Sequence, residues 1–202
     1  MTVERGRDWG ERRARPPDVV EVADDAAAGA LVNRLRAAGK PLPPIGLRAG
    51  DLRRTLGGAD TGLDAGEVGW YPVDLGVATF GGHTRWFVSH LVARRGWWRG
   101  EVVALMNAEF LGHWDVAPRS HPNDGRLDLV RTVDLRVGDR WKAWRRLAGG
   151  THVPHPQITT GRVDDLALSF ARPLTVRLDG VACGRTNELR VHLEPDALVV
   201  CI

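Results

Sequence analysis

Two short stretches, Val176-Arg-Leu-Asp-Gly-Val181 and His121-Pro-Asn-Asp-Gly-Arg-Leu-Asp128, decide the fold that we expect. Each places an Asp-Gly pair beside apolar residues, which is the pattern of a tight turn between antiparallel strands. Around them, short apolar runs recur at regular spacing and favour a sandwich or barrel-like β domain. The expected strands cover residues 71–80, 84–92, 101–110, 127–133, 165–169, 174–178, 189–192 and 198–202, with one helix over 138–147.

The sequence before this region has a different pattern. An apolar run over residues 19–22 predicts a buried strand, and Asp24 or Asp25 can cap a helix over residues 26–38. A second short strand within 41–47 and a second short helix from Asp51 follow. We therefore expect an α+β protein: a disordered, charged arm over 1–17, a small α/β fragment over 18–60, and an antiparallel β domain over 67–202.

The composition is that of an ordinary globular domain, with 43% hydrophobic and 26% charged residues. It excludes a disordered, collagen-like or coiled-coil chain, and no apolar run reaches the roughly 18 residues of a membrane span. A formal net charge of +3 is small for a dedicated nucleic-acid binder, so we expect no nucleic-acid partner. Because there are only two cysteines and no apolar leader segment, we expect a cytoplasmic location.

General catalytic motifs are absent from the sequence: it has no P-loop, G-x-G-x-x-G, G-x-S-x-G or H-E-x-x-H. His152 and His155 form the only close histidine pair, and a polar loop is favoured there over a metal site. Two aromatic–basic stretches, 94–99 and 141–146, favour core packing of at least one Trp each. Exposed Trp beside Arg would also suit an anionic membrane surface, so peripheral membrane contact stays an alternative.

Six short motifs follow one another in the C-terminal part of the chain. They are residues 107–112 (NAEFLG), 117–118 (AP), 123–128 (NDGRLD), 150–156 (GTHVPHP), 173–180 (PLTVRLDG) and 194–200 (EPDALVV). In this order they resemble the C-terminal β domain of the diacylglycerol kinase catalytic-domain family, which includes bacterial lipid kinases and the sphingosine and ceramide kinases. The resemblance covers about residues 70–202.

The resemblance extends to the α/β fragment, in an altered form. The family holds ATP phosphates with a Gly-Gly-Asp-Gly-Thr loop between a strand and a helix. A phosphate loop needs glycine so that backbone N–H groups come close, and it avoids fixed negative charge. The matching residues here supply extra β-carbons and an added anion: they are Ala23, Asp24, Asp25, Ala26 and Ala27. We therefore expect no ATP binding.

The family's second nucleotide motif matches this sequence at Asp51 and the helix after it. The residues that the family places before the Gly-rich loop have no counterpart, which suggests a truncated and degenerate member. The family's catalytic base would fall on Val181, which cannot accept a proton. Asp179 is either a displaced base or a simple hairpin residue.

The first Asp-Gly turn resembles a structural Mg²⁺ site of the bacterial members. By resemblance its ligands would be the carboxylate of Asp124 and the main-chain carbonyls of His121 and Arg126. Oxygen ligands on a tight turn suit a hard cation. The alternative is a hairpin turn without an ion.

The expected function is that of a non-catalytic relative (a pseudoenzyme) of the lipid kinases. It would bind a lipid or acyl ligand, or a partner protein, through its β domain, in an apolar pocket lined partly by strands 84–92 and 101–110. One alternative is an ATP-dependent lipid kinase that is active only when another chain supplies the nucleotide half. The other is a structural module that forms oligomers and has a filled cleft.

Overall fold

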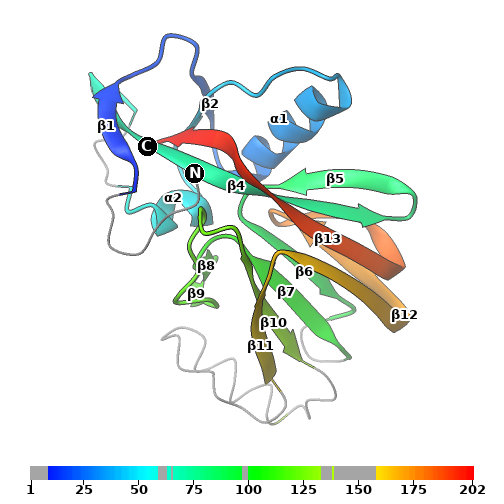
Figure 1. Cartoon of the computed structure of the whole chain (residues 1–202). Helices are drawn as coiled ribbons and strands as arrows, with labels where there is room; N and C mark the ends of the chain where they lie inside the picture. Colours follow the sequence, from blue (N-terminus) through cyan, green and yellow to red (C-terminus); the bar gives the residue numbers. More distant parts are fainter. Residues whose placement is uncertain (1–8, 59–62, 65, 97–99, 133–137, 139–157) are drawn as a thin grey trace.

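The computed structural model describes residues 9–58, 63–64, 66–96, 100–132, 138 and 158–202. Most of the helix expected over 138–147 lies outside these residues. So do His152, His155 and the stretch 141–146, and so does the Trp pair of 94–99. The predicted fold class is confirmed, because a largely antiparallel sheet carries a small α/β unit at one end (Figure 1).

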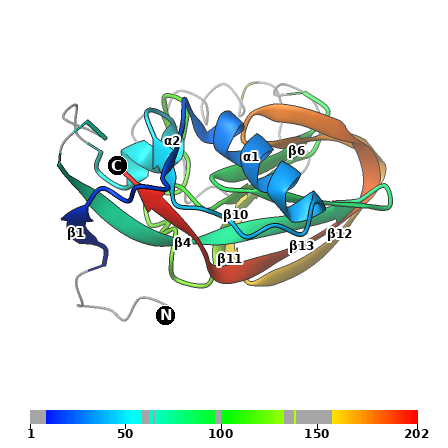
Figure 2. The ribbon, with the colours of Figure 1, turned by 90° about the horizontal axis from the view of Figure 1, so that it is seen from above.

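The α/β unit follows the predicted order of elements. It consists of β2 (Val20–Val22), α1 (Asp25–Ala37), β3 (Ile45–Leu47) and α2 (Asp51–Thr55), with β2 and β3 paired in parallel. Both helices pack over β4 and β13 (Figure 2), where leucine and valine side chains of the four elements form one buried cluster. The helix α1 begins directly after Asp24, as the capping pattern predicts.

The remaining strands form the antiparallel part of the sheet. They are β4 (Glu67–Phe80), β5 (His83–Phe87), β6 (His90–Arg94), β7 (Val102–Met106), β10 (Leu127–Thr132), β11 (Ile158–Val163), β12 (Asp165–Leu178) and β13 (Val181–Cys201), with a separate hairpin of β8 (Phe110–Leu111) and β9 (Trp114–Asp115). The described sheet has 11 strands in the order β1-β4-β13-β12-β6-β7-β10-β11, where β1 is Glu11–Ala14, with β5 on β4 and β3 on β13. Strands predicted as separate pieces are continuous in β12 and β13, where register shifts replace the expected breaks.

Two features differ from the predicted domain organisation. The strand β1 (Glu11–Ala14) pairs with β4, and Trp9 donates a hydrogen bond to the carbonyl of Pro72 (3.1 Å). The expected disordered arm therefore does not include residues 11–14. The side chains of β1 are exposed and charged, as they would be in a free arm, but the backbone of β1 is paired with β4. In addition, β3 pairs with β13, which joins the α/β unit and the β domain in one sheet.

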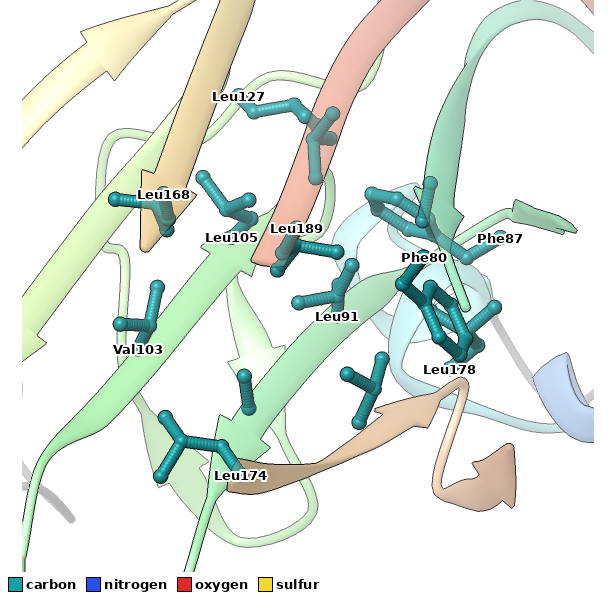
Figure 3. Packing of buried hydrophobic residues seen from close by; sticks show 14 of the residues in the cluster. Phe80, Phe87, Leu91, Val103, Leu105, Leu127, Leu168, Leu174, Leu178 and Leu189 are labelled. Atoms are coloured by element: carbon teal, nitrogen blue, oxygen red, sulfur yellow. The ribbon is translucent and has the colours of Figure 1, made fainter. Parts of the chain in front are cut away.

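The interior of the β domain is closely packed. Figure 3 shows Phe80 and Phe87 beside Leu91 and Leu178, with further leucines filling the space between the strands. Phe87 and Leu91 are fully buried, although the strand predicted over 84–92 is interrupted between them at Val88 and Ser89. That interruption lies at the candidate site.

Candidate functional site

A cleft of about 480 Å³ lies where the α/β unit meets the β domain. It is bordered by the first residues of α1 and α2, the start of β6, the β8–β9 hairpin, and the turn between β12 and β13. Asp25, Asp51 and Asp179 all line it. The resemblance had placed the first two in nucleotide motifs and the third beside the base position, and the structure brings these three carboxylates to one place.

Asp25 forms the floor of the cleft and is only 5% exposed. Its Oδ2 atom accepts hydrogen bonds from the backbone N–H groups of Asp51 (2.7 Å) and Leu52 (3.2 Å), at the start of α2. Burial raises the pKa of Asp25 to about 6. Gly50, with φ of 117°, allows this approach, because a β-carbon there would lie 2.4 Å from the Oδ1 atom of Asp25.

The Oδ1 atom of Asp25 accepts no hydrogen bond from the described residues, although it is buried. The hydroxyl of Ser89 lies near Asp25 and lowers its pKa somewhat, and it also forms a hydrogen bond with the Nδ1 atom of His90 (3.1 Å). A buried carboxylate oxygen without a donor is unfavourable and is uncommon in folded proteins.

Asp179 is bound to the backbone at the interruption between β5 and β6. Its carboxylate accepts hydrogen bonds from the N–H groups of Val88 (3.0 Å), Ser89 (2.8 Å) and His90 (3.1 Å). Burial, together with the charge of Asp25, raises the pKa of Asp179 to about 7. This carboxylate holds the start of β6 in place, which fits the hairpin role better than the role of a free base.

Asp51 and His90 form the wall beside Asp25. Both carboxylate oxygens of Asp51 accept from the N–H group of Gly112 (3.0 Å each), which fixes the β8–β9 hairpin to α2. The Nδ1 atom of His90 lies 3.8 Å from Asp51 Oδ2, and burial lowers the pKa of His90 to about 4, so its imidazole is neutral near pH 7. The described residues that line the cleft include no lysine or arginine.

The expected phosphate-loop residues lie partly in this cleft. Asp24, Asp25 and Ala26 line it, whereas Ala23 and Ala27 are not among its lining residues. The Oδ1 atom of Asp24 accepts a hydrogen bond from the N–H group of Ala27 (2.9 Å). The side chain of Asp24 thus takes a first-turn amide of α1, of the kind that a phosphate oxygen uses at a helix N-terminus.

The expected base and metal positions lie elsewhere. Val181 is 51% exposed and does not line the cleft. Both oxygens of Asp124 have partners: one forms an ion pair with Arg162 and the other accepts from the N–H group of Arg126 (3.1 Å). As arranged, the turn formed by His121, Asp124 and Arg126 does not fit Mg²⁺, because the ion would have to displace the Arg162 guanidinium. The described residues contain no group of three or more His, Cys, Asp or Glu side chains that could hold a metal ion.

Sequence reasoning missed the roles of His90 and of the β8–β9 hairpin. The hairpin contributes Leu111, Gly112, His113 and Trp114 to the cleft. The motif at 107–112 resembles a family feature, but nothing in the motif itself indicates that the N–H group of its last glycine donates to Asp51. Neither described helix is long and apolar enough to cross a membrane.

These features define an α+β protein with a sandwich-like sheet and an acidic cleft where its two parts meet. Residues 82–202, more than half of the chain, match the family described as the YegS C-terminal NAD kinase beta sandwich-like domain, and the chain belongs to this family. Among curated proteins, none matches this sequence. The family match confirms the predicted relation to the diacylglycerol kinases.

Solved structures share the fold. A diacylglycerol kinase from Bacillus anthracis str. Sterne superposes with a TM-score of 0.64 at 16% identity, covering 91% of this chain and 75% of that one. Two structures provisionally described as a diacylglycerol kinase of the same organism give TM-scores of 0.66 and 0.67 at 14% identity, covering 91% of this chain and 77% of theirs. At such identities the likeness concerns the fold alone.

Proposed function

We propose that this chain is a non-catalytic relative of the diacylglycerol-type lipid kinases, and that its cleft binds a ligand without transferring phosphate. The observation that carries this proposal is the hydrogen bond from the Ala27 N–H group to the Asp24 carboxylate. A phosphate loop leaves its amides open to an anion. Here an anion of the chain itself takes that place.

The charge of the cleft supports the same conclusion. Asp24, Asp25 and Asp51 line it, and none of its described lining residues is a lysine or arginine that could neutralise a triphosphate. Like charges a few ångströms apart repel by about 1 kcal/mol or more per pair, even when water screens them well. A nucleotide would have to overcome this repulsion without the positioning that the reaction needs.

The residues around the expected base position also argue against phosphoryl transfer to a lipid. A positioned general base is worth about 10²–10⁴-fold in rate. Val181 cannot act as one, and Asp179 already accepts three backbone hydrogen bonds from the start of β6. Deprotonating a lipid hydroxyl would therefore fall to a group whose lone pairs are engaged in holding the fold.

Ligand binding would use the β domain. Leu111 and Trp114, from the β8–β9 hairpin within the matched region, form an apolar wall of the cleft. The strands that had been expected to line an apolar pocket place Phe87, Leu91 and Leu105 in the packed core instead. Among the described residues of these two strands, only His90 lines the cleft. A lipid, an acyl group or a side chain of a partner protein would thus contact the hairpin.

One observation favours the alternative of a kinase completed by a second chain. The three carboxylates converge as they would in a reaction centre, and the pKa of Asp179, about 7, lies in the range that suits a general base. A partner would then have to supply the cationic groups that the described part of the cleft lacks.

Three measurements separate these functions. Calorimetry with Mg-ATP is expected to show no binding to the purified chain, and radiolabelled ATP is expected to transfer nothing to diacylglycerol or sphingosine. Transfer by the unmodified chain that Asp179→Asn abolishes would overturn the proposal. Mass spectrometry of gently purified protein is expected to find copurified lipid, whereas a clean spectrum would favour a structural module.

A further inference from the structure

We propose that the cleft binds the protonated amine of an organic ligand, with the carbon chain of that ligand against Leu111 and Trp114. This goes beyond the proposed function and rests on it in one respect, because the cleft must be free of nucleotide. The shared chemistry is an alkylammonium group, which either a small free amine or a lysine side chain could supply.

The first argument is the sign of the charge. Asp24, Asp25 and Asp51 line the cleft, Asp25 being the most buried of the three, while His90 is uncharged near pH 7. Among the described residues, the carboxylate of Asp51 accepts hydrogen bonds only from the Gly112 N–H group, so it keeps free lone pairs. A cleft with walls of one sign concentrates ions of the opposite sign.

The second argument is independent of the number of carboxylates. The Oδ1 atom of Asp25 is buried without a hydrogen-bond donor in the described structure, and Asp25 faces the cleft. Gly50 packs directly against this oxygen, because a β-carbon at Gly50 would come within 2.4 Å of it. A bound ammonium group has three N–H donors and can supply the missing one.

The third argument concerns which cation fits. A metal ion would need several ligating side chains, and the described residues offer no such group. An apolar wall of Leu111 and Trp114 instead suits a carbon chain, and a tryptophan ring attracts an ammonium group near its face. The cleft volume of about 480 Å³ lies within the range of roughly 300–1,000 Å³ for small-molecule sites.

Binding should also release a proton. The titratable groups that line the cleft with Asp25 are Asp24 at the start of α1, Asp51 on α2, His90 on β6, His113 in the β8–β9 hairpin and Asp179 in the β12–β13 turn. A cation held among them favours the ionised form of Asp25, whose pKa is about 6 without ligand. Affinity for an amine should therefore rise between pH 5 and pH 8, while an alkylamine itself stays protonated up to about pH 10.

The test is calorimetric titration of the full chain with hexylamine at pH 7.5. Hexylamine is expected to bind, whereas hexanol and hexanoate, which share its carbon chain, are not. Repeating the titration in buffers of different ionisation enthalpy should reveal the released proton at pH 6. Equal binding of hexanol and hexylamine, or stronger binding of Mg²⁺ than of hexylamine, would overturn the proposal.

Variants locate the site. Asp25→Asn and Asp51→Asn should each weaken hexylamine binding by about ten-fold, while Asp165→Asn, which removes an exposed carboxylate outside the cleft, should leave it unchanged. Asp51→Asn carries the test if Asp25→Asn does not fold. Unchanged affinity in Asp51→Asn would contradict the proposal. Binding of Nα-acetyl-lysine amide as tight as that of hexylamine would assign the site to a partner's lysine, and weaker binding would assign it to a free amine.

The two proposals fail separately. Micromolar binding of Mg-ATP would overturn the non-catalytic function whatever hexylamine does. Absence of hexylamine binding in a chain that also ignores Mg-ATP would remove the amine site and leave the non-catalytic function in place.

Discussion

The molecule contains two groups of aspartates that differ in how their oxygens are satisfied. At the first Asp-Gly turn, the buried Asp74 accepts from the N–H groups of Gly125 (2.8 Å) and Asp196 (2.9 Å), and Asp124 pairs with Arg162. Each carboxylate oxygen of these two residues has a donor. In the cleft, by contrast, Asp25 has an oxygen with no donor in the described structure, and no lysine or arginine is among the described lining residues.

This difference separates carboxylates that stabilise the fold from a carboxylate that has an acceptor available to a ligand. The carboxylate of Asp74, on β4, accepts hydrogen bonds from the turn at 123–126 and from the register shift of β13. Both of its oxygens therefore stabilise backbone and are not available to a ligand. The cleft has the same residue type with unused acceptors. Counting donors therefore separates Asp74 and Asp124 from Asp25, although Asp128, at the end of the same turn motif, also has a buried oxygen without a donor in the described structure.

The largest effect should come from Asp74→Ala. The variant leaves the N–H groups of Gly125 and Asp196 without their acceptor, and a buried unpaired donor costs about 1–3 kcal/mol. We expect the free energy of unfolding to fall by about 3 kcal/mol in urea titrations, against less than about 0.5 kcal/mol for the exposed control Asp165→Asn. A fall of under about 1 kcal/mol for Asp74→Ala would mean that the network is not structural.

The next effect is on the pH dependence of stability. The raised pKa values of Asp25 (about 6) and Asp179 (about 7) mean that the folded chain keeps protons that the unfolded chain releases near pH 4. The free energy of unfolding should therefore fall as pH rises from about 4 to about 7, and this contribution should be constant above that range.

Asp179→Asn should flatten this slope, as urea unfolding of the two proteins between pH 4.5 and pH 8 would show. The lowered pKa of His90 gives an opposite slope below about pH 6.5, but it is common to both proteins and cancels in the comparison. Identical slopes would show that Asp179 does not carry the proton.

A smaller effect is expected from Asp24→Ala, which removes the N-cap of α1. Loss of such a cap typically lowers stability by about 1 kcal/mol. Thermal unfolding should report this change, whereas Asp24→Asn, which keeps a side-chain oxygen to accept from the Ala27 N–H group, should lose only a few tenths of a kcal/mol. If the two variants were equally destabilised, the hydrogen bond to Ala27 would not be what stabilises the start of the helix.

The smallest effect concerns Mg²⁺ at the turn of Asp124. Because Arg162 already pairs with this carboxylate, Mg²⁺ should not shift the thermal midpoint of the unmodified chain. In Arg162→Gln the oxygen is free, and Mg²⁺ at its dissociation constant should add about 0.4 kcal/mol. A shift in the unmodified chain that Asp124→Asn removes would show that the ion displaces the arginine.

Local sequence patterns predicted much of the fold. The order of β2, α1, β3 and α2, the capping by Asp24 and the hairpin turn at Asp179 each depend on a few neighbouring residues. The strand β1 was missed because its exposed charged side chains give no apolar pattern. The breaks expected in β12 and β13 were wrong because local turn and charge signals do not show that partner strands carry the backbone through a register shift.

By itself, the sequence determined the family, the fold class and the residue types of the cleft. Only the tertiary structure decided what those residues can do. Asp25, Asp51 and Asp179 come from segments far apart in the chain, so their convergence depends on long-range packing. The raised pKa values, the neutral His90 and the unpaired Oδ1 atom of Asp25 all result from burial, and burial belongs to the assembled fold because it is set by what surrounds a side chain in space.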